Sequence, residues 1–527
     1  MKLVQKCLLG LFLIFSVAQL SATTLKLKIV DLKTGKIIPA RVLIKSDAGK
    51  SFVPLNAVTL KIGKEIWFMS PGKSVVEINT DNVMLRVERG KEYIRIKSRL
   101  KLNNKKEVEK KIILHRWINM KKLGYLSGEN HLHQPPDKIA ANAAAEDLNY
   151  SSILDWWNGT RFAIPKGTSN IRKLKFGKII VPTAVYDVEI EDNWGASYLF
   201  DNPKPFPLPV DPKRPHLFDV KYGKEVGALV CYQSGWSREV LIDALLGYVE
   251  VVNVCNNNFH MHRYQPRSRY SNPLNVKDFP IYPNTPVGMM KMNTDTYYRL
   301  LNCGLKLAAG AGSASGVKET PVGYNRAYVR CSAKDGFSGF VKAWRAGKNF
   351  VTNGPMLFLK TSEGLQPGNS LNISGSKKVV LDVKAISDSP LGSVEIVING
   401  KVVKSFPVEK DVKKFKGSFT LSISKSSWIC ARCTDTDMLL TNKELEEYRS
   451  PRVHLFQDPN RLRYAHTSPI YIYVNGKSIA VKKSIKEGLK MIDAFKKFAK
   501  KNSSEKYLNT ILNSADKAKE ILSKKLK

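Results

Sequence analysis

Cysteine, histidine and acidic residues are all scarce in this chain of 527 residues. Its one Cys-x-x-Cys pair, Cys430 and Cys433, has no second pair elsewhere in the sequence, so a zinc knuckle lacks ligands. We expect these two cysteines to be neighbours on a strand or to form a local disulfide. Acidic residues number 46 against 85 lysines and arginines, which gives a net charge of +39. Such a charge suits anionic polymers or anionic membrane surfaces, and equally a basic solvated surface.

Several motifs that would indicate a function are missing as well. No Ser-His-Asp arrangement is evident, and the glycine-rich stretch 310–316 (GAGSASG) lacks the Lys-Ser/Thr of a phosphate-binding loop. No nucleic-acid-binding motif is present, so nucleic acid is not an expected partner. Beyond the N-terminus, no apolar run predicts a transmembrane segment.

The N-terminus has the pattern of a secretory signal peptide. Lys2 and Lys6 precede an apolar stretch at residues 8–17, and the small residues up to Ala22 offer a cleavage site. The apolar stretch is too short to cross a bilayer comfortably. Residues 1–22 therefore predict a secreted or periplasmic protein, with a retained N-terminal anchor as the alternative.

Two regions, residues 23–120 and 356–480, have the pattern of β-sandwiches. Apolar and polar residues alternate with period two, as at residues 25–30, and turn residues separate the runs. Residues 29–49 resemble the start of carboxypeptidase-regulatory-like and carbohydrate-binding-like sandwiches. Asn399-Gly400 and Asn475-Gly476 follow apolar runs and predict hairpins.

The region between them, residues 121–355, alternates strand-like runs with helical runs. Such alternation favours βα units around a parallel sheet or barrel, and polar residues cluster after the strands, where barrel enzymes carry their chemistry. The tail, residues 481–527, has two apolar stripes at helical spacing and predicts a basic helical hairpin. The predicted fold class is thus α/β plus all-β.

Two His-x-His pairs stand out among the eight histidines. On a strand, residues i and i+2 point to the same face, so His131 and His133 could offer two imidazoles to one metal ion. The second pair, His260 and His262, follows a predicted strand at residues 248–254. Because the strand ends of one barrel converge, we expect His260 to join the first pair. The alternative is that both pairs are solvated loop histidines.

The order of motifs resembles that of CehA/McbA-like metallohydrolases of the polymerase-and-histidinol-phosphatase (PHP) superfamily. Residues 127–133 (SGENHLH) resemble the Gly-Asp-x-His-x-His opening of that family, with Glu129 at the Asp position. Residues 188–196 (VEIEDNWGA) resemble the segment that carries a metal-ligand Glu, and the spacing to Gly195 favours Glu189 over Glu191. Further collinear matches extend the resemblance over residues 121–480; they are GALVCYQSGW, VEVVN, AAGAGSASG, GYNRAYV and FVTNGP.

The resemblance implies a distorted (β/α)7 barrel that binds one to three divalent metals and hydrolyses esters, often phosphoesters, with a metal-activated water. The sequence departs from the family at several ligand positions, which are Trp156, Ser234-Gly235, Ala314 and Gly316. An intact trinuclear centre is therefore excluded. What remains is one metal held by His131, His133 and Glu189, with His260 as a substitute ligand. Nitrogen-rich ligation suits zinc, manganese or iron.

Other residues are candidates for supporting roles. Glu129 and Asp155 are the predicted catalytic residues; Asp155 could ligate the metal, act as a general base or orient an imidazole, and its alternative role is a helix N-cap. Arg263 and Arg326 could bind a substrate anion, or could be surface charges. Trp156 could stack on a sugar ring or fill the core.

The sequence therefore predicts an exported metal-dependent hydrolase of ester or phosphoester bonds, with a glycan or another anionic polymer as its substrate. The alternative is a degenerate, inactive PHP-like barrel that binds a glycan or an anionic polymer, and the replaced ligands favour it. If His131, His133, Glu189 and His260 do not converge within metal-ligand reach, the hydrolase hypothesis fails.

Overall fold

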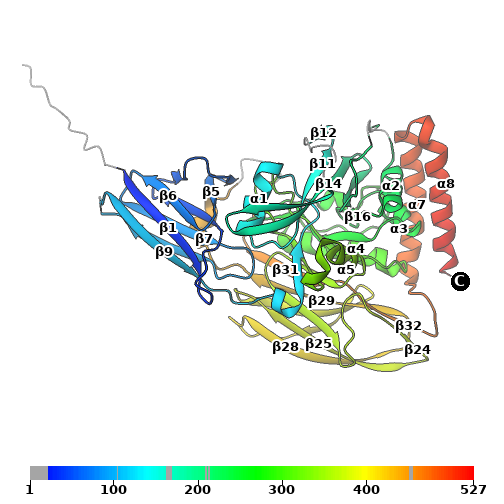
Figure 1. Ribbon diagram of the computed structural model, residues 1–527. Coiled ribbons are helices and arrows are strands. Elements are labelled where there is room, and N and C mark those ends of the chain that lie inside the picture. Colours follow the sequence, from blue (N-terminus) through cyan, green and yellow to red (C-terminus); the bar gives the residue numbers. More distant parts are fainter. Residues whose placement is uncertain are drawn as a thin grey trace, which may run out of the picture.

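The computed structural model describes residues 22–103, 105–161, 169–207, 211, 214–449 and 455–526. In Figure 1, an N-terminal pair of sheets lies at one end of the molecule and a helical hairpin at the other, and between them the central region lies above a C-terminal pair of sheets. The predicted signal peptide lies outside the described residues, except for Ala22. In the part of the chain that is described, no helix is long and apolar enough to cross a membrane.

The N-terminal region consists of two sheets around an apolar core. One has the order β6-β1-β9, and the other has the order β4-β5-β2-β7-β8 with β3 on β2. Alternate residues of β1, such as Leu25, Leu27 and Ile29, are buried between the sheets, as period-two spacing requires. The strands are β1 (Thr23–Asp31), β2 (Ala40–Ser46), β3 (Ser51–Phe52), β4 (Thr59–Ile62), β5 (Glu65–Ser70), β6 (Lys73–Ile78), β7 (Asn82–Glu88), β8 (Ile96–Lys101) and β9 (Glu107–Leu114).

The central region is built on a mixed sheet, with the order β12-β11-β14-β15-β16-β17-β20 and with β13 on β14. Its strands are β10 (Tyr125–Gly128), β11 (Ser151–Trp157), β12 (Thr160–Arg161), β13 (Ile171–Phe176), β14 (Ile179–Asp192), β15 (Gly195–Phe200), β16 (Leu229–Tyr232), β17 (Val251–Cys255), β18 (Phe259–His260), β19 (Arg263–Tyr264) and β20 (Ala308–Ala311). Its helices are α1 (Pro136–Ala145), α2 (Leu217–Val226), α3 (Val240–Leu245), α4 (Pro286–Asn302) and α5 (Gly336–Arg345).

The prediction of a PHP-like (β/α)7 barrel is wrong. Residues 179–192 form one long strand, β14, and a short turn at Asn193 and Trp194 returns the chain as β15. Strands β14, β15 and β16 are therefore antiparallel neighbours, where a barrel of this kind needs parallel strands joined by helices. Strand residues also outnumber helical residues in the described chain. Alternating apolar residues identify strands but do not distinguish parallel from antiparallel pairing.

The C-terminal region also has two facing sheets, and the larger one continues into the central region. It has the order β10-β21-β22-β31-β29-β26-β27, with β32 on β29 and β24 on β32, and it faces the sheet β23-β25-β28. These elements are β21 (Arg326–Arg330), β22 (Asn349–Thr352), β23 (Met356–Thr361), β24 (Ser370–Ile373), β25 (Lys377–Ile386), β26 (Leu391–Ile398), β27 (Lys401–Phe406), β28 (Lys414–Ile423), β29 (Ser427–Thr436), α6 (Asn442–Glu446), β30 (Phe456–Gln457), β31 (Leu462–Thr467) and β32 (Ile470–Val474).

The structure contains one of the two hairpins predicted from the Asn-Gly pairs and lacks the other. Asn399 and Gly400, with φ of 49° and 82°, join the antiparallel strands β26 and β27, so this predicted hairpin is confirmed. Asn475 and Gly476 adopt φ of 53° and 68°, but the chain then enters a helix. The second predicted hairpin is wrong, because the turn is present without a following strand.

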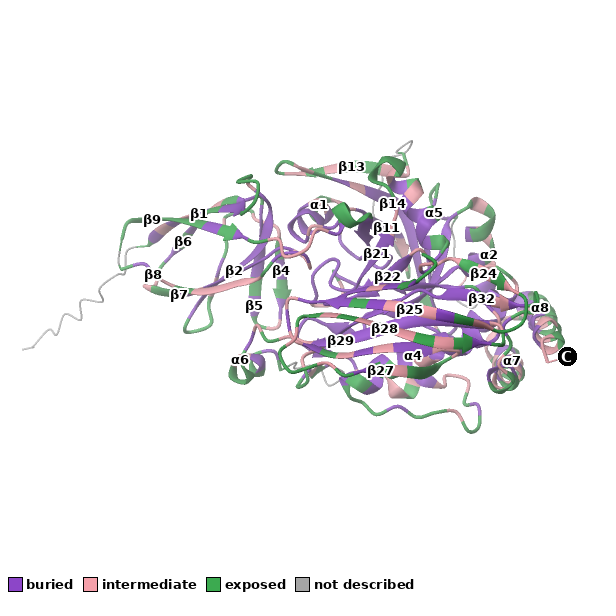
Figure 2. Ribbon diagram, turned by 90° about the horizontal axis from the view of Figure 1, so that it is seen from below, coloured by how far each residue is buried: buried purple, intermediate pink, exposed green. Residues whose placement is uncertain are grey.

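Two antiparallel helices, α7 (Lys482–Asn502) and α8 (Glu505–Lys524), end the chain. The apolar residues Ile485, Ile492 and Phe495 of α7 are buried against the body. Exposed residues dominate the outer face of both helices (Figure 2). Trp194, in the turn between β14 and β15, packs its ring against Phe495 and Phe498. The hairpin therefore supports the tip of the strand pair that carries Glu189.

The six cysteines of the described chain are free. Cys430 and Cys433 both lie on β29 and are buried, and an odd spacing on a strand directs them to opposite faces. The two residues are therefore strand neighbours without a local disulfide.

Buried ion pairs join the N-terminal sheets to the rest of the molecule. Arg41 contacts Glu88 at 2.8 Å and Glu146, beside α1, at 2.6 Å. Arg86 contacts Glu88 at 3.0 Å, and its guanidinium also donates to the Tyr448 hydroxyl at 2.7 Å. All of these side chains are buried, so removal of one partner would leave an uncompensated charge in the interior.

Glu88 should make the stability of the protein sensitive to acid. Burial opposes its ionisation, but Arg41 and Arg86 outweigh that effect and lower the pKa of Glu88 to about 2 from 4.5. Stability from the ionised carboxylate is present above pH 4.5 and is lost as the pH falls toward 2. We expect Glu88→Gln to be less stable at pH 7 and to lose less stability on acidification. Thermal unfolding between pH 7 and 2 measures this, with the exposed Glu77→Gln as control; parallel curves for parent and Glu88→Gln would contradict it.

Candidate metal centre

The His-x-His segment follows β10 and is held like a strand. His133 donates its backbone N–H to the Ser315 carbonyl at 2.8 Å, and the Ala314 N–H donates to the His131 carbonyl at 2.9 Å. This extended pairing places both imidazoles on one face, as period-two geometry predicts. Glu189 reaches the same place from β14.

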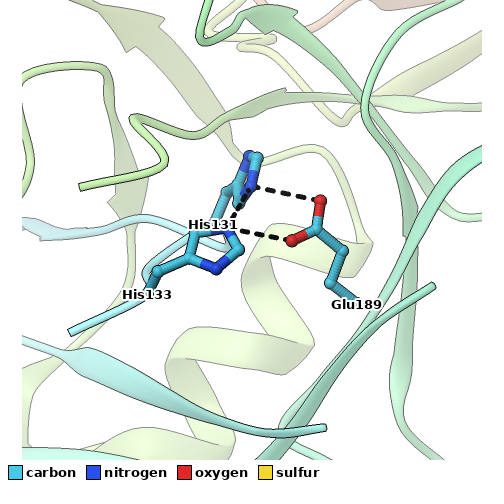
Figure 3. A group of neighbouring side chains, drawn as sticks. All are labelled: His131, His133 and Glu189. Carbon is cyan, nitrogen blue, oxygen red and sulfur yellow. Dashed lines mark hydrogen bonds and ion pairs between the residues drawn. The ribbon is translucent and has the colours of Figure 1, made fainter. Parts of the chain in front are cut away.

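The ligand atoms of these three side chains face one another (Figure 3). The Nε2 atoms of His131 and His133 are 2.9 Å apart. Glu189 places Oε1 3.3 Å from His131 Nε2 and Oε2 2.9 Å from His133 Nε2. A metal ion at about 2.0–2.2 Å from three such atoms holds them roughly 3 Å apart. The donor set and its spacing therefore fit one divalent transition metal.

Two neighbouring side chains hold the imidazoles in place. The Tyr198 hydroxyl lies 2.9 Å from His131 Nδ1, which leaves His131 Nε2 to face Glu189. Such a contact on the far nitrogen is the usual way a ligating histidine is oriented. The Trp157 ring meets the His133 ring edge to face, with 4.5 Å between centroids. Both residues are paired with Glu189 across the sheet, Trp157 from β11 and Tyr198 from β15.

The electrostatics favour the ligating forms of Glu189 and His131. Burial opposes ionisation of Glu189, but the adjacent imidazoles outweigh it and hold the pKa of this carboxyl far below its usual range. Burial also lowers the pKa of His131, although Glu189 acts in the opposite direction. An ionised carboxylate and a neutral imidazole are the species that bind a metal.

The glycine-rich stretch packs directly on the His-x-His segment. A Cβ at Gly312 would lie 2.4 Å from His131 Cβ, and one at Gly316 would lie 2.4 Å from the His133 carbonyl oxygen. Gly316 also has φ of +113°, which side chains rarely allow. Next to His131, the Asn130 and Asn253 amides exchange two hydrogen bonds of 2.9 Å. The stretch GAGSASG therefore supports the site through its backbone rather than through ligands.

The other predicted ligand and the two predicted catalytic residues do not join the group. His260 is buried, and its Nε2 lies 3.0 Å from the Asn257 carbonyl oxygen. Glu129 accepts from the backbone N–H groups of Ser313 and Gly323, and burial raises its pKa to about 8. Asp155 lies within β11, so its interpretation as a helix N-cap is wrong.

The structure places the predicted substrate-binding residues in packing roles. Arg263 and Arg326 are fully buried, so neither is a surface charge. Arg263 forms an ion pair with Glu319, while Arg326 donates to the Gly323 carbonyl at 2.6 Å. Trp156 packs on the main core.

Three residues near the site are not among the predicted site residues: Trp157, Tyr198 and Arg267. Trp157 follows Trp156 directly, and only the pairing of β11 with β14 decides which ring faces Glu189. Arg267 lies close enough to Tyr198 to lower the pKa of its hydroxyl, although burial dominates and raises that pKa. No sequence motif marks Tyr198 or Arg267, because both are brought in by tertiary contacts.

Comparison with protein-family models and with curated proteins finds no match to this chain. The site is therefore interpreted from its own geometry.

Tyr198 offers a direct test of how the site is oriented. We expect Tyr198→Phe to weaken metal affinity by about 10–100-fold, because His131 loses the partner of its Nδ1. Competition with a chelating dye measures this affinity. Tyr297→Phe is the matched control, since it removes a buried hydroxyl that bonds to the Leu307 carbonyl instead. Equal losses in the two variants would show that Tyr198 acts through general packing.

Proposed function

We propose that this chain is an exported hydrolase of ester bonds that depends on one divalent transition metal, namely zinc, manganese or iron. The convergence of His131, His133 and Glu189 carries this proposal, because three protein ligands suffice for a catalytic metal site. His260 lies outside the group, so the predicted four-residue centre is not formed, and this favours the inactive alternative. Three protein ligands leave one position of a tetrahedral metal open for water. A metal in this place would make that water acidic enough to supply hydroxide near neutral pH. Glu189 and the two imidazoles would hold the ion, and Tyr198 would keep the His131 imidazole in its orientation.

One cationic side chain near His131, His133 and Glu189 supports an anionic substrate. Arg267 lies close enough to Tyr198 and Glu191 to interact with them electrostatically, and Glu191 in turn affects the pKa of His131. Within the described chain, Nε of Arg267 is buried without a hydrogen-bond acceptor. Buried guanidinium N–H groups without acceptors favour a phosphate, sulfate or carboxylate oxygen as their partner.

A glycan or another anionic polymer that carries such an ester is the substrate we propose. The alternative function is an inactive protein that binds the same kind of polymer. The sequence at Trp156, Ser234-Gly235, Ala314 and Gly316 favours that alternative, because these residues cannot replace the metal ligands of the resembled family.

Turnover of small esters by the metal-loaded protein tests the proposal. We expect metal-dependent hydrolysis of an aryl phosphate or aryl sulfate, with kcat/KM reduced at least tenfold in Arg267→Gln and unchanged for a neutral aryl ester. Arg269→Gln is the matched control, because Arg269 is exposed and lies over Tyr270. Absence of turnover with zinc, manganese and iron would favour the inactive alternative. An unchanged Arg267→Gln would remove the anion-binding role.

A further inference from the structure

A concave region lies between the N-terminal sheets and the central region. It is a groove of about 1100 Å³, with walls from the turn after β1, residues 115–122, and the first residues of β14. Tyr150, just before β11, and Ile179, at the start of β14, line it. Glu189 lies ten residues beyond Ile179 on the same strand, which corresponds to about 33 Å. The groove is therefore separate from the metal centre.

The rim of this groove is strongly basic. Five exposed lysines from three segments line it, and within the described chain none of them has an ion-pair partner: Lys33, Lys36, Lys121, Lys122 and Lys178. The exposed His115 lies on the same wall. The rim therefore presents a set of ammonium groups that are available to an incoming anion.

The acidic residues of the groove are already engaged, so they do not neutralise the rim. Arg116 contacts Glu92 at 2.6 Å and Asp147 at 2.7 Å. The Tyr93 hydroxyl donates to Asp31 at 3.0 Å, which satisfies a hydrogen bond but leaves the charge of Asp31 in place. The five lysines therefore outnumber the one carboxylate of the wall, Asp31, that has no ion-pair partner in the described chain.

The wall also offers a neutral donor. The indole Nε1 of Trp117 is buried and, among the described residues, has no hydrogen-bond acceptor. Tyr93 and Tyr150 are only 3% and 6% exposed, so they give no open ring for base stacking. A concave wall also does not match the flat surface of a bilayer. These features favour a single flexible chain rich in hydroxyl and anionic groups.

We propose that this groove binds an acidic polysaccharide, with its carboxylate or sulfate groups at the lysine rim and a sugar oxygen at Trp117. The lysines act as point charges that tolerate variable spacing along a polymer. Binding here needs neither the metal nor turnover. The groove would thus hold the polymer at a distance from the metal centre.

Two variants of equal charge test this site. The groove variant replaces Lys33, Lys36, Lys121, Lys122 and Lys178 with Gln. The control variant replaces five exposed lysines of α7, which likewise have no ion-pair partner in the described chain: Lys482, Lys486, Lys490, Lys497 and Lys501. Calorimetric titration of the full chain with polygalacturonate and with dextran sulfate, at about 0.15 M salt to screen general attraction, gives the affinities.

We expect the groove variant to bind at least one of these polymers tenfold or more weakly than the parent, while the α7 variant stays within about twofold. Trp117→Phe, which keeps the ring and removes the N–H, should weaken binding severalfold. Neutral dextran should not bind.

Four results would overturn the proposal: no binding of either polymer by the parent, equal losses in the two variants, a loss confined to the α7 variant, or equally tight groove-dependent binding of polyglutamate, single-stranded DNA or anionic vesicles. Equal circular dichroism and unfolding midpoints in the variants are needed for these comparisons. Because binding is measured without metal, the result is independent of whether the metal centre hydrolyses esters.

Discussion

A His131→Ala/His133→Ala variant should contain no tightly held transition metal, whereas the parent should hold about one per chain after reconstitution with zinc. The variant keeps only Glu189 of the three facing side chains. A single carboxylate cannot replace two imidazoles, because structural and catalytic zinc sites use at least three protein ligands. Elemental analysis after extensive dialysis measures the content directly.

The matched control for this experiment is His260→Ala/His262→Ala. It removes the other His-x-His pair, which the structure places outside the group. It should retain about one metal per chain. Metal retained by the first variant would locate the binding elsewhere. A parent that holds no metal, even after reloading with zinc, manganese and iron, would contradict the proposed centre and support the inactive alternative.

Arg463→Ala should lower the free energy of unfolding by about 3–5 kcal/mol, because it leaves buried carboxylates without their cation. Arg463 contacts Asp388 at 2.7 Å and Asp435 at 2.8 Å; Arg463 and Asp435 are buried, and the Asp388 side chain is 12% exposed. Arg95, from the loop between β7 and β8, contacts Asp388 at 3.1 Å and Asp437 at 2.7 Å in the same network. Arg95 alone cannot compensate for the lost charge.

Guanidinium unfolding followed by tryptophan fluorescence measures this loss. Arg449→Ala is the control, because its pair with Glu446 is exposed and spans 3.8 Å. Exposed pairs of this kind contribute about 0–1 kcal/mol. Equal unfolding midpoints for the parent and Arg463→Ala would mean that the three aspartates are protonated or hydrated once the arginine is removed.

The sequence identified His131, His133 and Glu189 as neighbours, but it did not identify the residues that surround them. His131 and His133 are adjacent on an extended segment, so their common orientation follows from local geometry alone. Glu189 was chosen by its spacing to Gly195, and the turn before Gly195 does place it opposite Tyr198. His260 was assigned by assuming that strand ends meet as in a barrel. That assumption failed because β14, β15 and β16 are antiparallel.

The remaining differences have the same origin in tertiary packing. Asn475-Gly476 forms its expected turn, but nothing in the dipeptide specifies that α7 follows instead of a strand. Arg263 and Arg326 have the chemistry of anion-binding residues, yet their burial depends on segments far away in the sequence. Trp156 and Trp157 are indistinguishable by composition, and only the register of β11 places Trp157 against His133.

The hydrogen bond between Arg86 and Tyr448 has a consequence for the order of folding. Its two residues are 362 positions apart, and the contacts of Arg95 with Asp388 and Asp437 are similarly distant. During synthesis from the N-terminus, the first sheets emerge long before these partners exist. Contacts of such sequence separation form slowly. Until they form, the uncovered surface of the N-terminal sheets is prone to association with other molecules. The N-terminal sheets should therefore reach their final docked state only after most of the chain has emerged.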